Sequence, residues 1–581
     1  MNLTWLPTRQ IFNWLIQNRI GLGLAICVPV LVCGDWQWNN WQRMRRWKMA
    51  DELSGAAVFW GVPKANPANN EYVYGKRTQD GLAVYWQNAA GNKSLIWNRK
   101  EGDFNPSTFR IHDWSPDGKY FVFTTDGHVC VRESNDGQQV ADLNVGGGLI
   151  NLVWLSPSNI VTFTWRDLYL LQHKQKEWSK TKLSTVKNAN PRMLTRLSGT
   201  SVAWLQGNDV WTCDIPAGGP RKISDSTTNP VVAISVAAGG ALLMDCGTNG
   251  GDLYRCVPAA PEMPLVHLGV VGKRGDFIYK VYGINNGGYA WLESNQRDRD
   301  SRPAVENKNF TLYVQNPGKK APERVLGDRE IEDCEQNGEH LYILGTQTNE
   351  PPGLWDYNVN SELLNCLLPA LPPLRYAAFA AVTYHVTTND LDQAVGYYIW
   401  APTCLIPGKK YPLMLGQSTY RWVLEAEVAA NSGYYFAMAE RPTWSSERFR
   451  NWGEDVQSVC TALIKNENID TNRIVLSSTS TAEGWPLQQL MENDPAFAAG
   501  AFLSGGMGPK TTCGYPANIE MLVGDKDQYF KLDALKRYLE DAAHNGIAVK
   551  IVLRNGPHST IALENQILLA REYADFLRDN K

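Results

Sequence analysis

The sequence lacks the patterns by which metals, nucleotides and nucleic acids are usually bound. It contains no C-x-x-C pair and no metal-ligand cluster among its 8 histidines, so zinc and thioredoxin-like chemistry have no support. The triple glycine at residues 146–148 is not followed by a helical pattern, which argues against a phosphate-binding loop. The formal net charge is −3, so nucleic acid is not an expected partner. We expect no metal and no other cofactor.

Long apolar runs are almost absent too. The exception, Ile20–Gly34, is short for a membrane-spanning helix unless residues 12–16 contribute. It fits a signal-anchor helix, a cleaved signal peptide ending near residues 32–34, or a buried helix of a cytoplasmic protein. Positive charges at residues 43–48 argue against export of the bulk. Because an uncharged Trp/Asn stretch precedes those charges, we favour a membrane anchor with the bulk exported to the periplasm or the extracellular space.

Cysteine is infrequent, and its pattern does not indicate whether the protein lies in an oxidising or a reducing cellular compartment. The chain has 11 cysteines, an odd number. Cys246 and Cys256 flank a glycine-rich turn and are candidates to face each other across a hairpin, as are Cys334 and Cys366 at longer range. Scattered buried thiols are at least as good an interpretation.

What the sequence has in abundance is short strands. At 581 residues, two or more domains are expected. The clearest strand–turn–strand unit is Ile111–Glu133, in which Pro116 and Gly118 supply the turn geometry. Seven such units recur at a period near that of a propeller blade, which predicts a seven-bladed β-propeller in which the tryptophans are packing residues. The units are Leu82–Trp97, Ile111–Glu133, Leu149–Leu171, Ser201–Ile223, Val231–Val257, Tyr279–Val314 and Cys334–Tyr357.

A proline-rich stretch, Leu368–Leu374, marks a domain boundary. We therefore divide the chain into an N-terminal segment (1–50), the propeller (51–375) and a C-terminal domain (376–581). In the last, strands alternate with helical patterns, which predicts a mostly parallel, doubly wound α/β sheet. The helix expected over Ser446–Asn466 carries Val456, Val459, Leu463 and Ile464 on one face.

Three residues with the chemistry of a hydrolase each follow a predicted strand of this domain. Ser480 lies in a turn between the strand Arg473–Leu476 and a helical stretch, where a nucleophile elbow would present its serine. Asp527 and His558 follow the next two strands. Because ligands bind at the carboxyl edge of open α/β sheets, we expect the three to form a catalytic triad. Their order, Ser then Asp then His, is that of α/β-hydrolases.

The chain resembles the prolyl oligopeptidase family of serine peptidases, which carries an α/β-hydrolase domain behind a β-propeller. The resemblance covers nearly the whole chain after about residue 55 and rests on the order of several short motifs. These are Tyr411–Gly416, Ala439–Arg441, Trp452–Val456, Asp470–Ile474, Pro495–Phe497 and Phe502–Gly505.

The resemblance implies a mechanism. Ser480 would attack the scissile carbonyl of a peptide, His558 would carry the proton, and Asp527 would hold the imidazole, with Asp525 in reserve. The oxyanion would be held by the backbone N–H of Thr481 and by Gln417, which replaces a tyrosine that many members have.

Departures from the family pattern keep two other functions open. Ser478 and Ala482 replace the usual elbow glycines, and Asp527 follows Ser480 by only 47 positions, which is short for the family and implies a shortened wall of the specificity pocket. A catalytically inactive member acting as a binding or scaffolding protein is one alternative. An esterase that uses the same triad is the other. Oligomeric state is not predicted.

Overall fold

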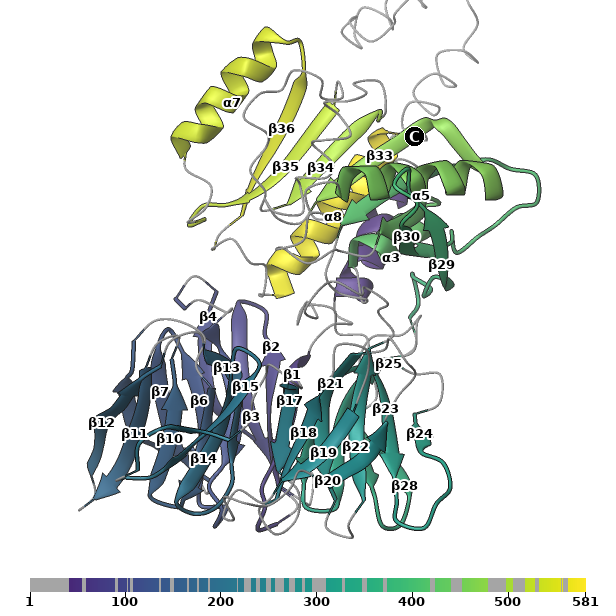
Figure 1. The fold of residues 1–581 in the computed structure, drawn as a ribbon. Coiled ribbons are helices and arrows are strands. Elements are labelled where there is room, and N and C mark those ends of the chain that lie inside the picture. The colour runs from purple at the N-terminus through teal and green to yellow at the C-terminus, as the bar shows by residue number, and fades with distance from the viewer. Residues whose placement is uncertain are drawn as a thin grey trace, which may run out of the picture.

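The computed structural model contains two domains, a β-propeller and an α/β domain, stacked one above the other (Figure 1). It describes residues 41–580 apart from several longer gaps and from short ones, most of which lie in the propeller loops, with residues 55–58 and 555 outside them. The longer gaps are 224–230, 237–240, 247–251, 257–265, 271–276, 295–309, 347–352, 369–373, 418–423, 440–451, 479–497, 505–517, 528–531 and 557–562. The segment Ile20–Gly34 lies outside the described residues. No helix within the described part of the chain is long and apolar enough to span a membrane.

The propeller has seven blades of four antiparallel strands, as predicted. Blade 1 comprises β1 (Phe59–Ala65), β2 (Tyr72–Arg77), β3 (Gly81–Gln87) and β4 (Lys93–Lys100), and blade 2 comprises β5 (Arg110–Trp114), β6 (Tyr120–Thr125), β7 (His128–Glu133) and β8 (Gln139–Asn144). Blade 3 comprises β9 (Asn151–Ser156), β10 (Asn159–Phe163), β11 (Asp167–Lys174) and β12 (Glu177–Thr185), and blade 4 comprises β13 (Ala189–Arg196), β14 (Ser201–Gln206), β15 (Asp209–Asp214) and β16 (Arg221–Lys222).

Blades 5 to 7 follow the same pattern. Blade 5 comprises β17 (Val231–Val236), β18 (Leu242–Cys246), β19 (Asp252–Cys256) and β20 (Val266–Val270). Blade 6 comprises β21 (Phe277–Gly283), β22 (Tyr289–Ser294), β23 (Phe310–Gln315) and β24 (Glu323–Val325). Blade 7 comprises β25 (Glu330–Asn337), β26 (His340–Thr346), β27 (Gly353–Asn358) and β28 (Leu363–Leu368). A single bridge between Phe310 and Ile331 also links blade 6 to blade 7.

Local sequence explains the blades. Gly118 adopts a φ of +71° and its N–H donates to Ser115 O, which closes the turn between β5 and β6. Trp114, Trp154 and Trp204 are buried between blades, as expected for packing residues.

Both proposed cysteine pairings are wrong. Cys256 pairs with Leu242, so Cys246 lies four residues further along the same hairpin. Cys334 and Cys366 lie on β25 and β28, which are separated by two strands, or about 14 Å at the usual strand spacing. Disulfides need Cα atoms closer than about 7 Å.

The C-terminal domain is built on one eight-stranded sheet with the order β29-β30-β32-β31-β33-β34-β35-β36. From β32 onward in this order neighbouring strands are parallel, whereas β29 and β30 are antiparallel additions. The strands are β29 (Val382–Thr388), β30 (Ala394–Trp400), β31 (Tyr411–Gln417), β32 (Tyr435–Ala439), β33 (Ile469–Ser478), β34 (Gly500–Ser504), β35 (Asn518–Gly524) and β36 (Ala548–Arg554). The helices are α3 (Leu424–Asn431), α5 (Trp452–Asn466), α7 (Leu532–His544) and α8 (Leu563–Asp579).

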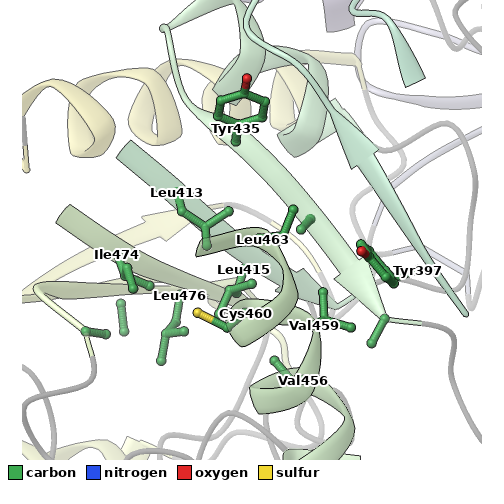
Figure 2. Close-up of a cluster of buried hydrophobic side chains, with 14 of the residues drawn as sticks. Tyr397, Leu413, Leu415, Tyr435, Val456, Val459, Cys460, Leu463, Ile474 and Leu476 are labelled. Carbon is green, nitrogen blue, oxygen red and sulfur yellow. The ribbon is translucent and has the colours of Figure 1, made fainter. Parts of the chain in front are cut away.

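Helices cover both faces of this sheet, which confirms the doubly wound arrangement. On one face α5 lays Val456, Val459 and Leu463 against β31 and β33 (Figure 2). The prediction that Ile464 shares this buried face is wrong, because Ile464 is 39% exposed. It is adjacent in sequence to Leu463 and therefore points about 100° away from it around the helix.

The other face is covered by α3, α8 and a helix at residues 41–54. Leu53 of this N-terminal helix is fully buried, and the Asp51 carboxylate pairs with Arg571 of α8. The Glu52 carboxylate accepts hydrogen bonds from the N–H groups of residues 375–377, where the chain returns from the propeller. The expected boundary at residue 50 falls inside this helix, which packs with the C-terminal domain.

Candidate active site

The strand order reverses around β31, because the chain runs from β31 to β32 on one side and then to β33 on the other. Such a switch point is where open α/β sheets bind ligands, beyond the carboxyl ends of the strands. Gln417, the last residue of β31, pairs with Ser478, the last residue of β33. The carboxyl ends of these two strands therefore lie side by side at this edge.

The described residues include only part of the predicted site. Gln417 ends β31, but its side chain is not described. Ser480 and Thr481 lie just beyond the described end of β33, and His558 lies in the undescribed stretch between Gly556 and α8. Asp527 alone is described with its side chain, and it is buried, with 9% of its surface exposed.

Asp527 lies in a turn that is held against the end of β36. The N–H of Asp525 donates to Arg554 O at 2.9 Å, and the N–H of Lys526 donates to Gly556 O at 3.0 Å. In return, the Gly556 N–H donates to the Asp525 carboxylate at 2.7 Å. Asp525, the reserve candidate for the acid, thus anchors the backbone two residues before His558.

Sequence reasoning missed the charged group that lies beside this turn. Glu101, which follows β4 of the propeller, accepts a hydrogen bond from Arg554 Nη1 at 3.1 Å. Its other carboxylate oxygen accepts from Asn565 Nδ2 of α8 at 3.1 Å. The Glu101 and Arg554 side chains are almost completely buried, at 2% and 1% exposed. No sequence signal could have paired residues that are 453 positions apart.

The electrostatics of this group are those of a compensated buried charge. Burial lowers the pKa of Arg554, although Glu101, Asp527 and Asp525 act to raise it. An isolated buried guanidinium would be costly, so the Glu101 carboxylate is needed for Arg554 to lie there. Arg554 in turn places a positive charge near the buried Asp527.

Comparisons with solved structures identify the architecture. The chain is similar to a puromycin-hydrolysing peptidase of Mycobacterium tuberculosis, at 12% identity and a TM-score of 0.72, over 91% of this chain and 96% of that one. It is similar to a puromycin hydrolase at 14% identity and a TM-score of 0.71, over 91% and 96% of the two chains. One of two prolyl endopeptidases matches at 12% identity and a TM-score of 0.70, over 92% of each chain. The chain has the prolyl oligopeptidase fold.

The fold implied by the sequence resemblance is therefore confirmed for both domains. Neither the family models nor the curated proteins gave a match to this sequence. Within the prolyl oligopeptidase fold, the assignment of Ser480, Thr481, Gln417, Asp527 and His558 to catalytic roles stays a prediction.

Proposed function

We propose that the chain is a serine peptidase that hydrolyses short peptides through an acyl-enzyme. Ser480 is the nucleophile, His558 the general base and acid, and Asp527 the carboxylate that orients the imidazole. The propeller limits which peptides reach the site. The peptidase names of proteins with the same fold support this reaction class.

One observation carries the proposal. The strands that precede Ser480, Asp527 and His558 all belong to the same parallel set, and their carboxyl ends share one edge of the sheet. β33 and β35 are separated by one strand, or about 10 Å, a distance that the short segments beyond the strands can span. The hydrogen bonds between the Asp527 turn and the end of β36 bring the acid's backbone to the start of the histidine segment.

The reaction would follow from this arrangement. The imidazole of His558 takes the Ser480 proton as the hydroxyl oxygen attacks the peptide carbonyl, and then returns the proton to the leaving amine. Backbone N–H of Thr481 and the Gln417 amide would donate to the oxyanion. Water would then attack the ester bond of the acyl-enzyme, with His558 acting as base again.

The test is labelling of the full chain with a fluorophosphonate, beside Ser480→Ala and His558→Ala variants. We expect the wild type to label and both variants to lose labelling by at least about 10³-fold, because Ser480→Ala lacks the hydroxyl that reacts and His558→Ala lacks the base that activates it. A folded wild type that does not label would overturn the proposal of an enzyme and favour the alternative of a binding or scaffolding protein. Turnover of acyl esters but not of peptides would instead establish the esterase.

A further inference from the structure

One propeller carboxylate holds both ends of the segment between β36 and α8. Arg554 is the last residue of β36, and Asn565 lies in the first turn of α8. Both donate to Glu101, one to each carboxylate oxygen. The chain between them contains His558. This contact between the two domains therefore binds both ends of the segment that carries the predicted base.

Glu101 is itself fixed by the propeller. Its N–H donates to Asp80 O at 2.8 Å, which joins the end of β4 to the turn between β2 and β3. The neighbouring Gln79 O accepts from the N–H of Glu564 in α8 at 3.0 Å. In Figure 1 this end of blade 1 faces the C-terminal domain. Backbone hydrogen bonds therefore fix the position of Glu101 relative to both blade 1 and α8.

We propose that Glu101 is a positioning residue for catalysis, through which the propeller fixes the acid turn and both ends of the histidine segment. Glu101 holds Arg554, whose carbonyl oxygen accepts from Asp525 in the turn that carries Asp527. It holds Asn565 at the far end of the same segment. This inference rests on the proposed function, and it makes the propeller part of the catalytic geometry as well as a barrier to large substrates.

A charge argument gives a readout that a purely structural role would not move. The charged groups that face Arg554 are Glu101 from the propeller and Asp525 and Asp527 from the turn after β35. Loss of the Glu101 charge leaves the Arg554 guanidinium less compensated, four positions before His558, the proposed base. Nearby positive charge disfavours an imidazolium, so the acid limb of the pH profile should move to lower pH.

The experiment measures fluorophosphonate labelling of the full chain, resolved into the inactivation rate constant kinact and the binding constant KI. Glu101→Gln keeps the shape of the side chain but removes its charge, and should lower kinact on the order of 10²-fold with KI unchanged. Asn565→Ala removes the hydrogen bond from α8 to Glu101, leaves the Glu101–Arg554 ion pair in place, and should lower kinact about tenfold. The acid limb should shift in Glu101→Gln alone.

A matched control comes from the same blade. Glu71 is a carboxylate that accepts from Trp86 Nε1 at the opposite end of blade 1, so Glu71→Gln should leave kinact unchanged. Wild-type kinact in both folded test variants would overturn the positioning role alone. An equal decrease of kinact in Glu71→Gln and Glu101→Gln would also overturn the positioning role of Glu101. If Glu101→Gln does not fold, Asn565→Ala decides the matter. A wild type that does not label would overturn both the proposed peptidase function and the positioning role of Glu101.

Discussion

At the scale of single residues, Gly556 is a position beside the candidate site where both backbone conformation and close neighbours disfavour a side chain. Its φ is +136°, and a Cβ there would lie 3.2 Å from Glu101 Oε1 and 3.3 Å from Arg554 Nη1. The glycine is needed for two reasons, a backbone conformation that L-residues avoid and the close approach of a buried ion pair. It lies two residues before His558, where a small displacement would reach the base.

We therefore expect Gly556→Ala to lower the free energy of unfolding by about 1–3 kcal/mol and to slow labelling as well. Gly546→Ala is the control, because Gly546 also has a positive φ, +71°, but has open space where its Cβ would stand. That variant should lose about 1–2 kcal/mol with no change in labelling. Thermal unfolding and labelling rates of the two variants make the comparison. Wild-type labelling of Gly556→Ala would contradict the argument.

At the scale of elements, the helix at residues 41–54 belongs to the C-terminal core although it precedes the propeller in the chain. Leu53→Ala removes a fully buried side chain from the cluster that this helix shares with α3 and α8. We expect it to cost about 2–5 kcal/mol of stability. Met44→Ala, on the same helix at 55% exposed, should change stability by less than about 0.5 kcal/mol. Thermal unfolding of the full-length variants tests this, and equal effects would contradict the packing described.

The same helix shows where sequence reasoning stops. Turn chemistry at Gly118 and the apolar spacing of Val456 and Leu463 are local, so the blades and α5 could be predicted from neighbouring residues. From the sequence alone, the charges of the N-terminal helix are notable only because they follow the apolar run Ile20–Gly34. In the structure Arg43 and Arg46 face Asp575, at 3.6 and 3.5 Å, more than 500 residues away.

The candidate site likewise has a part that local sequence predicts and a part that it does not. The strand-end positions of Ser480, Asp527 and His558 follow from the alternation of strands and helices, which is a local pattern. Glu101 could not be found, because its function depends on how two domains meet. A buried carboxylate between β4 and the next blade has no sequence signature that separates it from a surface loop residue.

At the scale of the whole molecule, side chains close the propeller ring. Blade 1 is built entirely from β1–β4 and blade 7 entirely from β25–β28, so no strand is shared between the first and last blades. Across this junction Lys64 Nζ contacts Glu335 Oε1 at 2.8 Å, and Lys280 Nζ of blade 6 contacts the same oxygen at 3.2 Å. The Lys64 backbone oxygen also accepts from Trp114 Nε1 of blade 2. One carboxylate thus connects the two ends of the ring.

The ionisation of Glu335 predicts when this junction weakens. Burial opposes the charged form, but Lys280 and Lys64 outweigh it and hold the pKa of Glu335 at about 2, below the ordinary 4.5. The unfolded chain therefore binds this proton first as the pH falls, so the stabilisation present above pH 4.5 is lost between pH 4.5 and 2. The protection factors of β1 and β25 amides, which compare each measured exchange rate with the intrinsic rate at the same pH, should fall over this interval in the wild type.

Glu335→Gln should show faster exchange of β1 and β25 already at pH 7, because two lysines then meet without their shared carboxylate. Its protection factors should fall less in acid than those of the wild type. Glu323→Gln is the matched control, since Glu323 pairs with Lys319 on the exposed surface of blade 6, where such a pair contributes less than about 1 kcal/mol. Wild-type exchange of Glu335→Gln at pH 7 would mean that apolar contacts between blades 1 and 7, such as those of Tyr72 and Leu354, hold the junction without the ion pair. Faster exchange confined to β1 and β25 would mean that the ring opens at this junction before any blade unfolds.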